Sequence, residues 1–429
     1  MYDADLETKK IFIRRIKNEE KSAQNSADLS IGATACIVFA ACDPDNPEEK
    51  ENVELVLWGP AQQQKMAEEM IEAFKKEYTD KNYTITYNIV SEADAAGTIT
   101  TDVSQGADVY AFANDQLLVL HRAGALAQVG GTYLADIQAN NSASSVEAAT
   151  FDGKVYAYPY SDDNGYFLYY DKSKVSNPGS IEGILADCTA AGAKFIFDLD
   201  NSWYEAGFFF GAGASYNVTY ASDGSVSEVL CDFDDEVKGV IAGKAMIALA
   251  NSAAFLNGDD NSITAALGDG TFGAAVSGTW NAENVQNLLG ENYAACKLPT
   301  FTVDGQTYQM GSFAGCKLYG VNPTSDHLAD AHRLAAFLSS EAMQTKRFED
   351  MQIGPSNIKV AASEAVQANI ALAALAQQAE FATAQVAVPG GFWAAVESFG
   401  QEVVAKTVTL ENLLAKLKVM ADAIRASTT

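Results

Sequence analysis

A strand, a helix and a second strand follow one another near the start of the hydrophobic part of the chain. Residues 53–58 form a short apolar run that stops at Gly59-Pro60, and residues 83–89 alternate apolar and polar side chains. Between the two runs, apolar residues recur at helical spacing among Lys and Glu: Met66, Met70, Ile71 and Phe74. A helical crossover of this kind joins strands that lie parallel in one sheet. The segment therefore predicts a sheet of parallel strands connected by helices.

The same alternation of strands and helices continues along the chain. Short apolar runs predict further strands at 108–112, 154–160, 166–170, 195–197 and 274–276, and polar residues 161–165 separate the second run from the third. Apolar residues at helical spacing predict helices at 237–248, 328–338 and 410–424, the last with Thr409 as its N-cap, and the Ala-rich residues 361–386 are also predicted to be helical. The fold class is therefore α/β. Because 429 residues exceed one ordinary core, we expect two lobes.

The net charge excludes one class of function. The chain has a formal net charge of -28, and six basic and six acidic residues cancel within residues 1–41. All of the excess negative charge therefore lies in residues 42–429. A surface of this sign repels phosphate backbones, so we do not expect binding to nucleic acid.

The N-terminal region resembles an export leader. Residues 29–41 are an uncharged apolar run, shorter than the roughly 18 residues that a membrane-spanning helix needs. The run ends Val38-Phe39-Ala40-Ala41-Cys42, which resembles a lipobox in which Cys42 is lipidated and becomes the mature N-terminus. Phe39 replaces the usual Leu, and the preceding region is long and acidic for a signal, which points to a later translation start. The alternative is a disordered tail with an apolar patch. Residues 43–52 read as a polar tether.

Motifs of several enzyme classes are missing. Residues 273–279 have the glycine spacing of a phosphate-binding loop, but Thr279 stands where a lysine is required. The three histidines, His121, His327 and His332, lack the spacing that places two metal ligands on one helix face. We therefore expect no metal site, no cofactor and no histidine-dependent catalytic triad. A glycosidase acid/base pair among the 56 carboxylates stays open, because its signature is a distance in space.

Four cysteines lie beyond the leader region: Cys188, Cys231, Cys296 and Cys316. None belongs to a C-x-x-C pair, which argues against redox catalysis and structural zinc. If the protein is exported, its compartment is oxidising, and we expect the disulfides Cys188–Cys231 and Cys296–Cys316. Buried, unpaired thiols are the alternative.

A set of short segments, taken in chain order, resembles one known family. The segments are Val53–Trp58, Gly106–Asp115, Gly124–Ala127, Phe151–Pro159, Gly278–Asn281, Leu298–Phe301, Gly311–Gly315 and Gly391–Trp393. Each is weak alone, but their order is similar to that in extracellular solute-binding proteins of ABC importers, family 1, the group that contains maltose-binding protein. The resemblance extends over almost the whole chain after the leader.

The resemblance implies a periplasmic-binding-protein-like fold of two lobes with a hinge between them. The chain is expected to cross between lobes near Pro159–Asp163 and to return near Gly311–Phe313. After a leader and tether at 1–52, the first lobe would comprise 53–161 and 311–362, and the second lobe 162–310 and 363–429. Proteins of this type close about the hinge on their ligand.

All four tryptophans fall where the family's motifs place the ligand cleft: Trp58, Trp203, Trp280 and Trp393. A sugar offers apolar faces and a ring of hydroxyls, so its binder needs flat aromatic rings together with carboxylates and amides. Packing in a core is the alternative for each tryptophan. The set of four favours stacking on a sugar.

The resemblance implies further ligand-binding positions. Asn114-Asp115 matches a polar pair that holds sugar hydroxyls, although Asp115-Gln116 replaces the Asp-Arg of the maltose binder. Asp162 or Asp163 stands at the position of a hydroxyl-binding Glu, and one extra residue leaves both assignments open. In addition, Tyr204 matches a stacking tyrosine and Gln62 lies in the first polar loop.

The implied function is capture of an oligosaccharide without catalysis. The resemblance favours maltose or maltodextrin-type α-glucans, delivered to an ABC permease by a monomer that is lipid-anchored outside the cytoplasm of a bacterium, which we expect to be Gram-positive. A different oligosaccharide or a polyol is the first alternative. A surface glycosidase is the second.

Overall fold

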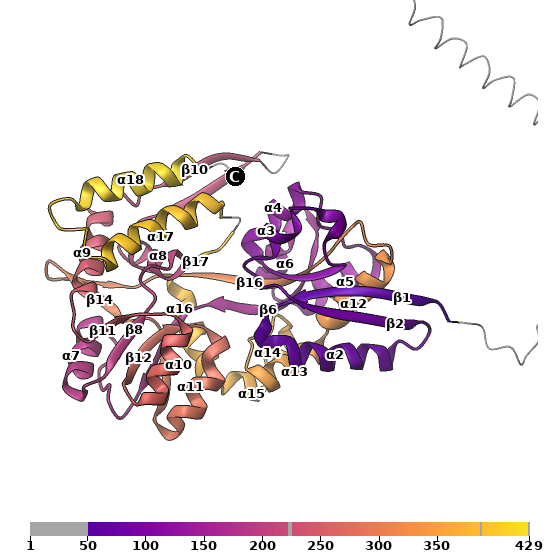
Figure 1. The fold of residues 1–429 in the computed structure, drawn as a ribbon, viewed down its shortest axis with the longest axis horizontal. Coiled ribbons are helices and arrows are strands. Elements are labelled where there is room, and N and C mark those ends of the chain that lie inside the picture. Colours follow the sequence, from indigo (N-terminus) through magenta and orange to yellow (C-terminus); the bar gives the residue numbers. More distant parts are fainter. Residues whose placement is uncertain (1–49, 222–224, 387, 428–429) are drawn as a thin grey trace, which may run out of the picture. The chain divides into compact units, whose positions relative to one another are not determined.

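The computed structural model describes residues 50–429 except 222–224, 387 and 428–429. Within this range the elements form two lobes, each built on its own sheet (Figure 1). We call them the first lobe, drawn on the right, and the second lobe, drawn on the left. The α/β class and the two-lobed, periplasmic-binding-protein-like fold are confirmed.

The first lobe is organised around a mixed sheet with the strand order β17-β16-β3-β1-β2, in which β6 also pairs with β16. The strands of this lobe are β1 (Asn52–Gly59), β2 (Asn82–Ile89), β3 (Val109–Ala113), β6 (Ala157–Gly165) and β16 (Ser312–Val321), while β17 (Ala382–Ala384) pairs only with the Ser312–Ala314 end of β16, on the side of the second lobe. β1 pairs in parallel with both β2 and β3, as the strand–helix–strand pattern predicts. The connecting helix α2 (Gln64–Glu77) buries Met66, Met70, Ile71 and Phe74, the four residues that predicted it.

Several short helices and the longer, consecutive helices α12 and α13 cover this sheet. They are α3 (Ala95–Ile99), α4 (Leu117–Arg122), α5 (Gly131–Asn140), α6 (Ala143–Ala148), α12 (Leu328–Leu338), α13 (Glu341–Met351) and α14 (Ile358–Ala361), with the small hairpin β4 (Thr150–Phe151) and β5 (Lys154–Val155). The rings of Phe74 on α2 and Phe337 on α12 meet edge to face with centroids 5.5 Å apart. This contact joins the N-terminal and late parts of the chain in one core.

The second lobe has a sheet of order β11-β8-β12-β7-β13. Its strands are β7 (Phe167–Asp171), β8 (Lys194–Phe197), β11 (Phe255–Asn257), β12 (Phe272–Ser277) and β13 (Tyr293–Cys296), and two hairpins stand apart: β9 (Tyr216–Tyr220) with β10 (Val226–Cys231), and β14 (Thr300–Val303) with β15 (Gln306–Gln309). Its helices are α7 (Ile181–Ala191), α8 (Ser202–Gly211), α9 (Lys238–Ala250), α10 (Asp260–Asp269), α11 (Ala282–Leu289), α15 (Glu364–Gln367), α16 (Ile370–Gln378), α17 (Gly390–Val404) and α18 (Leu413–Arg425).

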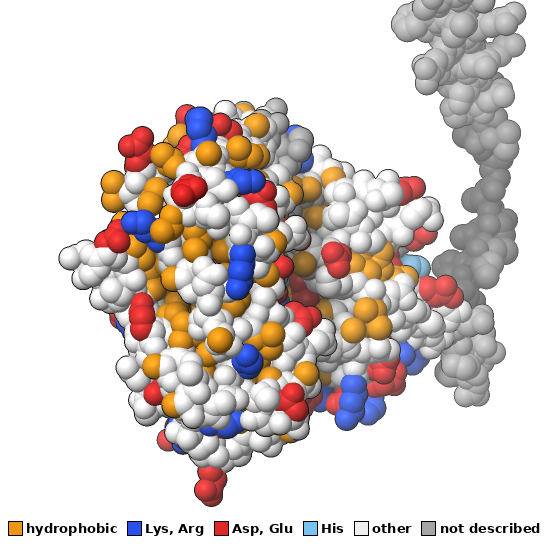
Figure 2. Space-filling view, turned by 60° about the vertical axis from the view of Figure 1, so that its left-hand side comes forward, with side chains coloured by type: hydrophobic (Ala, Val, Ile, Leu, Met, Phe, Trp, Pro, Cys, Tyr) orange, Lys and Arg blue, Asp and Glu red, His pale blue; other side chains and the backbone are white. Residues whose placement is uncertain are grey.

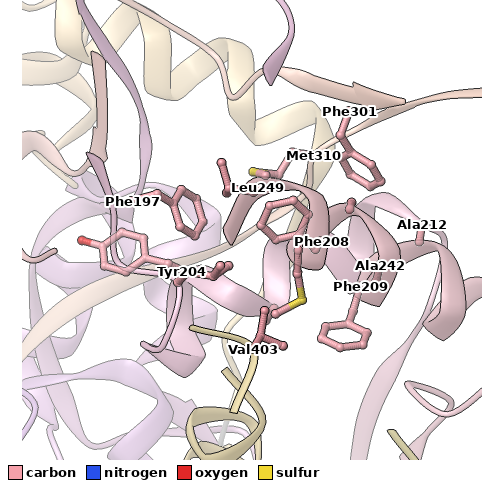
Figure 3. Close-up of a cluster of buried hydrophobic side chains, with 14 of the residues drawn as sticks. Phe197, Tyr204, Phe208, Phe209, Ala212, Ala242, Leu249, Phe301, Met310 and Val403 are labelled. Carbon is pink, nitrogen blue, oxygen red and sulfur yellow. The ribbon is translucent and has the colours of Figure 1, made fainter. Parts of the chain in front are cut away.

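Helix α8 is the centre of the second-lobe core. Phe208 and Phe209 are fully buried among residues from α9, α17 and the β14 hairpin (Figure 3). The ring of Phe209 stacks on that of Phe233 with centroids 4.4 Å apart. Burying aromatic rings of this size contributes about 1.5–3 kcal/mol each, so the helix is anchored firmly in its lobe.

Three sequence predictions of local structure need correction. Residues 161–165 do not separate two strands, because they form the end of β6. The last helix begins at Leu413 with Asn412 as its N-cap, because the Asn412 side chain accepts from the Thr409 backbone N–H and closes a turn first. The Ala-rich stretch is not one helix: Ser363 and Asn369 cap two short helices, and residues 382–384 form β17.

The chain passes between the two lobes three times. β6 leaves the first core after Tyr160 and reaches the second at Tyr166. β16 runs in the opposite direction, and Phe313 packs in the second core while Cys316 packs in the first. The third passage lies between Ile353 in the first core and Ala371 in the second lobe. These passages agree with a hinge, and the exact lobe boundaries stay a prediction.

No helix within the described residues combines the length and apolar character needed to cross a membrane. The view in Figure 2 shows Lys and Arg side chains scattered among acidic and hydrophobic ones rather than gathered in a patch.

Candidate functional site

Two tryptophans of the second lobe lie together at the junction of the lobes. Trp203 lies in the first turn of α8, whose N-cap Asn201 accepts from the Trp203 backbone N–H, and Trp280 follows the end of β12. Their ring centroids are 5.9 Å apart and their planes meet at 38°. Both rings are half-buried. Gly278 makes this position possible for Trp280, because a Cβ there would collide with the indole ring.

Both indoles are held by hydrogen bonds. The Trp280 Nε1–H donates to Asp260 Oδ2 over 2.9 Å, and the Trp203 Nε1–H donates to Gln385 Oε1 over 2.7 Å. Tyr166 and Tyr204 pack edge to face with the Trp203 ring, with ring centroids 4.6 and 5.1 Å away. Such rings with fixed edges suit stacking on the apolar face of a ligand.

A lysine from the hinge strand β16 reaches the Trp280 ring. Lys317 Nζ lies 5.3 Å from the centre of the Trp280 ring and 3.8 Å from Glu92 Oε1 of the first lobe. Glu92 is buried and also accepts from the Tyr160 hydroxyl over 3.0 Å. Lys317 therefore joins an acidic group of one lobe to an aromatic ring of the other.

Asp115 has an unpaired oxygen at the edge of the first lobe. The residue lies in a 3-10 turn directly after β3 and is only 7% exposed. Its Oδ1 atom has no hydrogen-bond partner among the described residues, and the nearby Gln385 side chain partly offsets the effect of burial on the pKa of the carboxylate. Burial raises the pKa of Asp115 to about 7. A buried carboxylate oxygen without a partner costs free energy unless a donor reaches it, and here a ligand hydroxyl is a suitable donor.

Asn114, the neighbour of Asp115, is used within the protein. Its Nδ2 donates to the Gln385 carbonyl over 2.6 Å, and its Oδ1 accepts from the Cys316 backbone N–H over 3.0 Å. Gly315 leaves room for this contact, because a Cβ there would collide with Asn114 Oδ1. Asn114 thus attaches the end of β3 to β16.

The two hinge aspartates are bonded to protein groups. Asp163 is 3% exposed, and its Oδ2 accepts from Thr279 Oγ1 and from the Gly354 backbone N–H, each over 2.6 Å. Asp162 accepts from the hydroxyls of Ser142 and Ser144, over 2.6 and 3.0 Å. Burial raises the pKa of Asp163. These contacts make both residues parts of the hinge, whatever further contact a ligand makes.

The remaining predicted positions are dispersed. Trp58 is half-buried, with its ring centroid 6.5 Å from that of Tyr110, and Gln62 is exposed. Trp393 is half-buried against Phe313, with ring centroids 5.5 Å apart. Tyr204 is 8% exposed and lies in the second-lobe core beside Phe197 (Figure 3), and its predicted role in stacking on a ligand stays a prediction.

Three cavities accompany these residues. One of about 1000 Å³ lies along the hinge between α4, α6 and α16, and it borders Asn114, Asp162 and Asp163 but none of the four tryptophans. A second, of about 650 Å³, includes Gln62. A third, of about 280 Å³, is lined by Tyr204, Asn201 and the carboxylates of Asp198, Asp259 and Asp260. The tryptophan pair therefore stands outside the largest of these three spaces.

The sequence did not indicate three residues of this junction: Glu92, Lys317 and Gln385. Lys317 stands in a strand whose other residues are mostly apolar or small. A single lysine in such a strand indicates a specific contact for its charge. Glu92 and Gln385 follow strand ends in polar or Ala-rich loops. Their contacts depend on partners far away in the chain, and no local pattern reveals them.

The predicted disulfides are wrong. All four cysteines are free thiols. Cys188 lies on α7 against Gly273, whereas Cys231 ends the separate hairpin strand β10. Cys296 belongs to the second-lobe sheet, whereas Cys316 packs in the first core and donates to Asp162. Burial raises the pKa of each thiol, which keeps it protonated and unreactive. Cys42, the predicted lipidation site, lies outside the described residues.

Residues 50–429, apart from the undescribed positions, contain no group of three or more His, Cys, Asp or Glu side chains that could hold a metal ion. The chemistry available at the junction is therefore that of aromatic faces, carboxylates, amides and one ammonium group.

Comparisons with known proteins give the family. Residues 69–374 match the model of bacterial extracellular solute-binding proteins. Comparison with curated proteins finds no match. A structure solved with acarbose is 30% identical, with a TM-score of 0.78, covering 87% of this chain and 99% of that one.

Two further solved structures share the fold at lower identity. The maltodextrin-binding protein MalE1 from L. casei BL23 is 22% identical, with a TM-score of 0.73, covering 88% of this chain and 100% of that one. The maltose-maltodextrin binding protein of Alicyclobacillus acidocaldarius is 20% identical, with a TM-score of 0.72, covering 87% and 100%. The family match extends over most of the two-lobed fold, and so the chain belongs to the bacterial extracellular solute-binding proteins.

Proposed function

We propose that this protein captures an oligosaccharide of the α-glucan type outside the cytoplasm and releases it to an ABC permease. The observation that carries the proposal is the unpaired Oδ1 of Asp115, a buried acceptor at the same junction as the paired indoles of Trp203 and Trp280. A sugar presents hydroxyl donors beside apolar ring faces. The site offers a counterpart for each of these features.

The tryptophan pair supports the ligand class. Trp203 and Trp280 are half-buried and fixed at their edges, so the orientation of each indole is set before a ligand binds. The structural neighbours were solved as maltodextrin-binding proteins or with acarbose, which is an oligosaccharide analogue. Trp280, Trp203 and Asp115 are the residues we assign to the ligand, with Trp58, Trp393 and Gln62 as further contacts.

Binding is proposed to close the two lobes about the hinge formed by β6 and β16. Asp163 supports this role because it bonds to Thr279 of the second lobe and to Gly354 at the third passage. We propose 53–161 with 311–362 as one closing body, and 162–310 with 363–429 as the other. Closure brings Asp115 and the tryptophans onto opposite sides of the ligand.

Delivery and anchoring are proposed from the family and the N-terminal sequence. A lipid on Cys42 would hold the protein at the outer face of the membrane of a Gram-positive bacterium, with residues 43–52 as a tether to the permease. Mass spectrometry of the protein from native membranes should find a lipidated N-terminal Cys42. An intact Met1 on exported protein would overturn the anchor.

A glycan panel tests the function. Maltose, maltotriose, maltoheptaose, a polyol and a β-glucan are added to the protein, and its melting temperature and tryptophan fluorescence are measured. We expect α-glucans to raise the melting temperature and to change the fluorescence. If only the polyol or the β-glucan shifts the melting temperature, the proposed α-glucan ligand is wrong but the binding role stands. If no compound in the panel shifts it, the proposed binding role is rejected.

The same incubations separate binding from hydrolysis. Each glycan is analysed by chromatography after prolonged contact with the protein. We expect intact glycan at every time point, because the proposal includes no bond cleavage. Release of shorter sugars would favour the glycosidase alternative, and a carboxylate pair would then have to be found in the cleft.

A further inference from the structure

Asp260 receives three hydrogen bonds on its carboxylate, and one of them comes from the ring of Trp280. The residue lies half-buried in the first turn of α10, and its Oδ2 accepts from the Trp280 indole N–H over 2.9 Å. Its Oδ1 accepts from Asn281 Nδ2 over 2.6 Å and from the Ser277 hydroxyl over 2.8 Å. Donors from the end of β12 and from the turn that follows it therefore converge on one side chain of α10.

Other residues fix the backbone of this turn. The Tyr169 hydroxyl donates to the Gly278 carbonyl over 2.9 Å, and the Thr279 hydroxyl donates to a hinge carboxylate over 2.6 Å. Neither contact involves the indole ring. The main chain thus determines where the Trp280 side chain begins, and the hydrogen bond to Asp260 determines the direction in which its ring points.

A carboxylate can accept from all three donors at once, whereas an amide cannot. An indole N–H can only donate, and each carboxylate oxygen can accept more than one hydrogen bond. An amide in this place has a single acceptor oxygen. If that oxygen keeps the two donors from Ser277 and Asn281, the amide nitrogen faces the indole N–H, so that donor meets donor. The contact with Trp280 is therefore the one that an amide loses.

We propose that Asp260 is a positioning residue for ligand binding, which holds the indole of Trp280 in the orientation that stacks on the sugar. The inference rests on the proposed function, because it acts through a residue that we assign to the ligand. Asp260 itself needs no contact with the sugar. Its effect on affinity must then depend on the presence of Trp280.

A double-mutant cycle tests this dependence. Maltotriose affinity is measured by titration calorimetry for the wild type, Asp260→Asn, Trp280→Ala and the double variant. With Trp280 present, Asp260→Asn should weaken binding about tenfold, the equivalent of one lost hydrogen bond. In the Trp280→Ala background the same change should weaken binding less than about twofold. An equal loss in the two backgrounds would overturn the inference.

Asp259→Asn is the matched control. Asp259 caps α10 by accepting from the Ser262 backbone N–H over 3.0 Å, and it lines the same small cavity as Asp260. The variant removes the same charge one position away, and asparagine is an equally good N-cap. Its maltotriose affinity should equal that of the wild type. An equal loss in Asp259→Asn and Asp260→Asn would show a general effect of charge and reject the positioning role.

The indole resonance of Trp280 gives a readout that needs no ligand. In protein with isotope-labelled tryptophan, each of the four tryptophans contributes one indole N–H signal to a nuclear magnetic resonance spectrum, and Trp280→Ala identifies the signal of Trp280. Asp260→Asn should move this signal to lower proton chemical shift, because a proton released from a hydrogen bond is more shielded. Asp259→Asn should leave it in place. An unmoved signal in Asp260→Asn contradicts the positioning role.

The positioning role and the proposed function fail in different ways. If the wild type binds no glycan, the proposed function fails, and the indole signal still tests whether Asp260 orients the ring. If the wild type binds maltotriose but Asp260→Asn binds it equally well, the function stands and the positioning role is rejected. Should Asp260→Asn not fold, Asp260→Ser takes its place with the same expectations, because its hydroxyl is too short to reach the indole.

Discussion

Buried carboxylates occupy two kinds of surroundings in this protein. Asp115 and Asp163 stand where the lobes meet, and Asp163 accepts from Thr279 of the second lobe. Glu205 instead lies inside the second-lobe core on α8, fully buried, and neither of its oxygens makes a hydrogen bond of normal geometry. Desolvation raises the pKa of Glu205 well above its usual range, and Asp200 and Glu397 add to the shift. A carboxyl group of this kind weakens the fold when it is ionised.

Replacing Glu205 should therefore make stability less dependent on pH. The folded state holds the Glu205 proton more tightly than the unfolded state, whose pKa is about 4.3. Wild-type stability must then decrease as the pH rises above that value and toward the folded pKa. Glu205→Gln should remove this decrease. The difference in melting temperature between the variant and the wild type should therefore increase in favour of the variant from pH 5 to pH 8. The exposed Glu349→Gln serves as a control with no gain, and parallel curves for Glu205→Gln and the wild type would contradict the assignment.

Trp280→Ala should weaken ligand binding more than it weakens the fold. Loss of a stacking ring in a binding site costs about 1–3 kcal/mol of binding free energy. The ring is only half-buried, so its removal leaves a small cavity. Titration calorimetry with an α-glucan and urea unfolding of the same variant give the two free energies separately. Tyr204→Ala is the contrasting core variant, in which about 3–5 kcal/mol of stability should be lost.

The result for Trp280 has two informative outcomes. A variant that binds normally once folded, but unfolds much earlier, would show that the tryptophan is a core residue. A variant that folds normally and binds weakly supports its place in the cleft.

Single residues of the site differ in how far sequence could reveal them. Asp115 was identified because it belongs to a segment that resembles a family motif, whereas Gln385 has no motif around it. Tyr204 is adjacent to Trp203 on a helix, where successive side chains point about 100° apart. One of the two can face the junction only if the other faces elsewhere, and the buried one is Tyr204.

At the scale of elements, helix α13 is attached to both hinge strands by one arginine. Arg347 is 1% exposed, and its guanidinium lies 4.7 Å from the centre of the Tyr160 ring of β6 and 5.4 Å from that of Tyr319 of β16. It also donates to the Tyr319 hydroxyl over 2.7 Å. The helix and the hinge strands therefore share one buried cation.

Arg347→Lys should destabilise the protein although the variant keeps the positive charge. A lysine ammonium cannot span the two rings, the hydroxyl and the Leu338 carbonyl at once, and its desolvation is then left unbalanced. We expect a loss of about 2–4 kcal/mol in urea unfolding, in line with removal of a buried charge partner. The adjacent Lys346→Ala removes only surface ion pairs and should cost less than about 1 kcal/mol. Equal losses for the two variants would contradict this role of Arg347.

Elements with a regular apolar period were predicted from sequence, and those with mixed composition were not. The stripe of Met66, Met70, Ile71 and Phe74 gives α2 directly, because each of these side chains is buried. The end of β6 is polar, and it is a strand because Asp163 and its neighbours find partners on other segments. In the Ala-rich stretch, helix propensity was read correctly, but the caps at Ser363 and Asn369 divide it.

At the scale of the whole molecule, ligand binding should both stabilise and compact the protein. An α-glucan at a hundredfold excess over Kd should add about 2.7 kcal/mol to the free energy of unfolding, since it binds only the folded state. Closure of the lobes should lower the radius of gyration in small-angle X-ray scattering. Addition of a β-glucan, if it does not bind, is the control. Stabilisation without compaction would show that the ligand binds without closing the hinge.

The two-lobed organisation followed from chain length and the ordered motifs, but the contacts between lobes did not. Thr279 and Asp163 are 116 positions apart, and Asn114 and Gln385 are 271 positions apart. Each contact exists only after both lobes have formed, so it leaves no periodic signal in either segment. The same reason explains why the tryptophans could be assigned to a cleft, whereas the pairing of Trp203 with Trp280 could not.

The three passages of the chain have a consequence for the order of synthesis. The first-lobe sheet places β16 next to β3, so its central pairing waits for residues 312–321, long after β1, β2 and β3 have left the ribosome. Contacts of such high sequence separation form slowly, because the intervening chain must be closed into a loop first. An N-terminal fragment that ends before β16 therefore lacks the strand that completes its sheet. The topology delays native folding until most of the polypeptide is available.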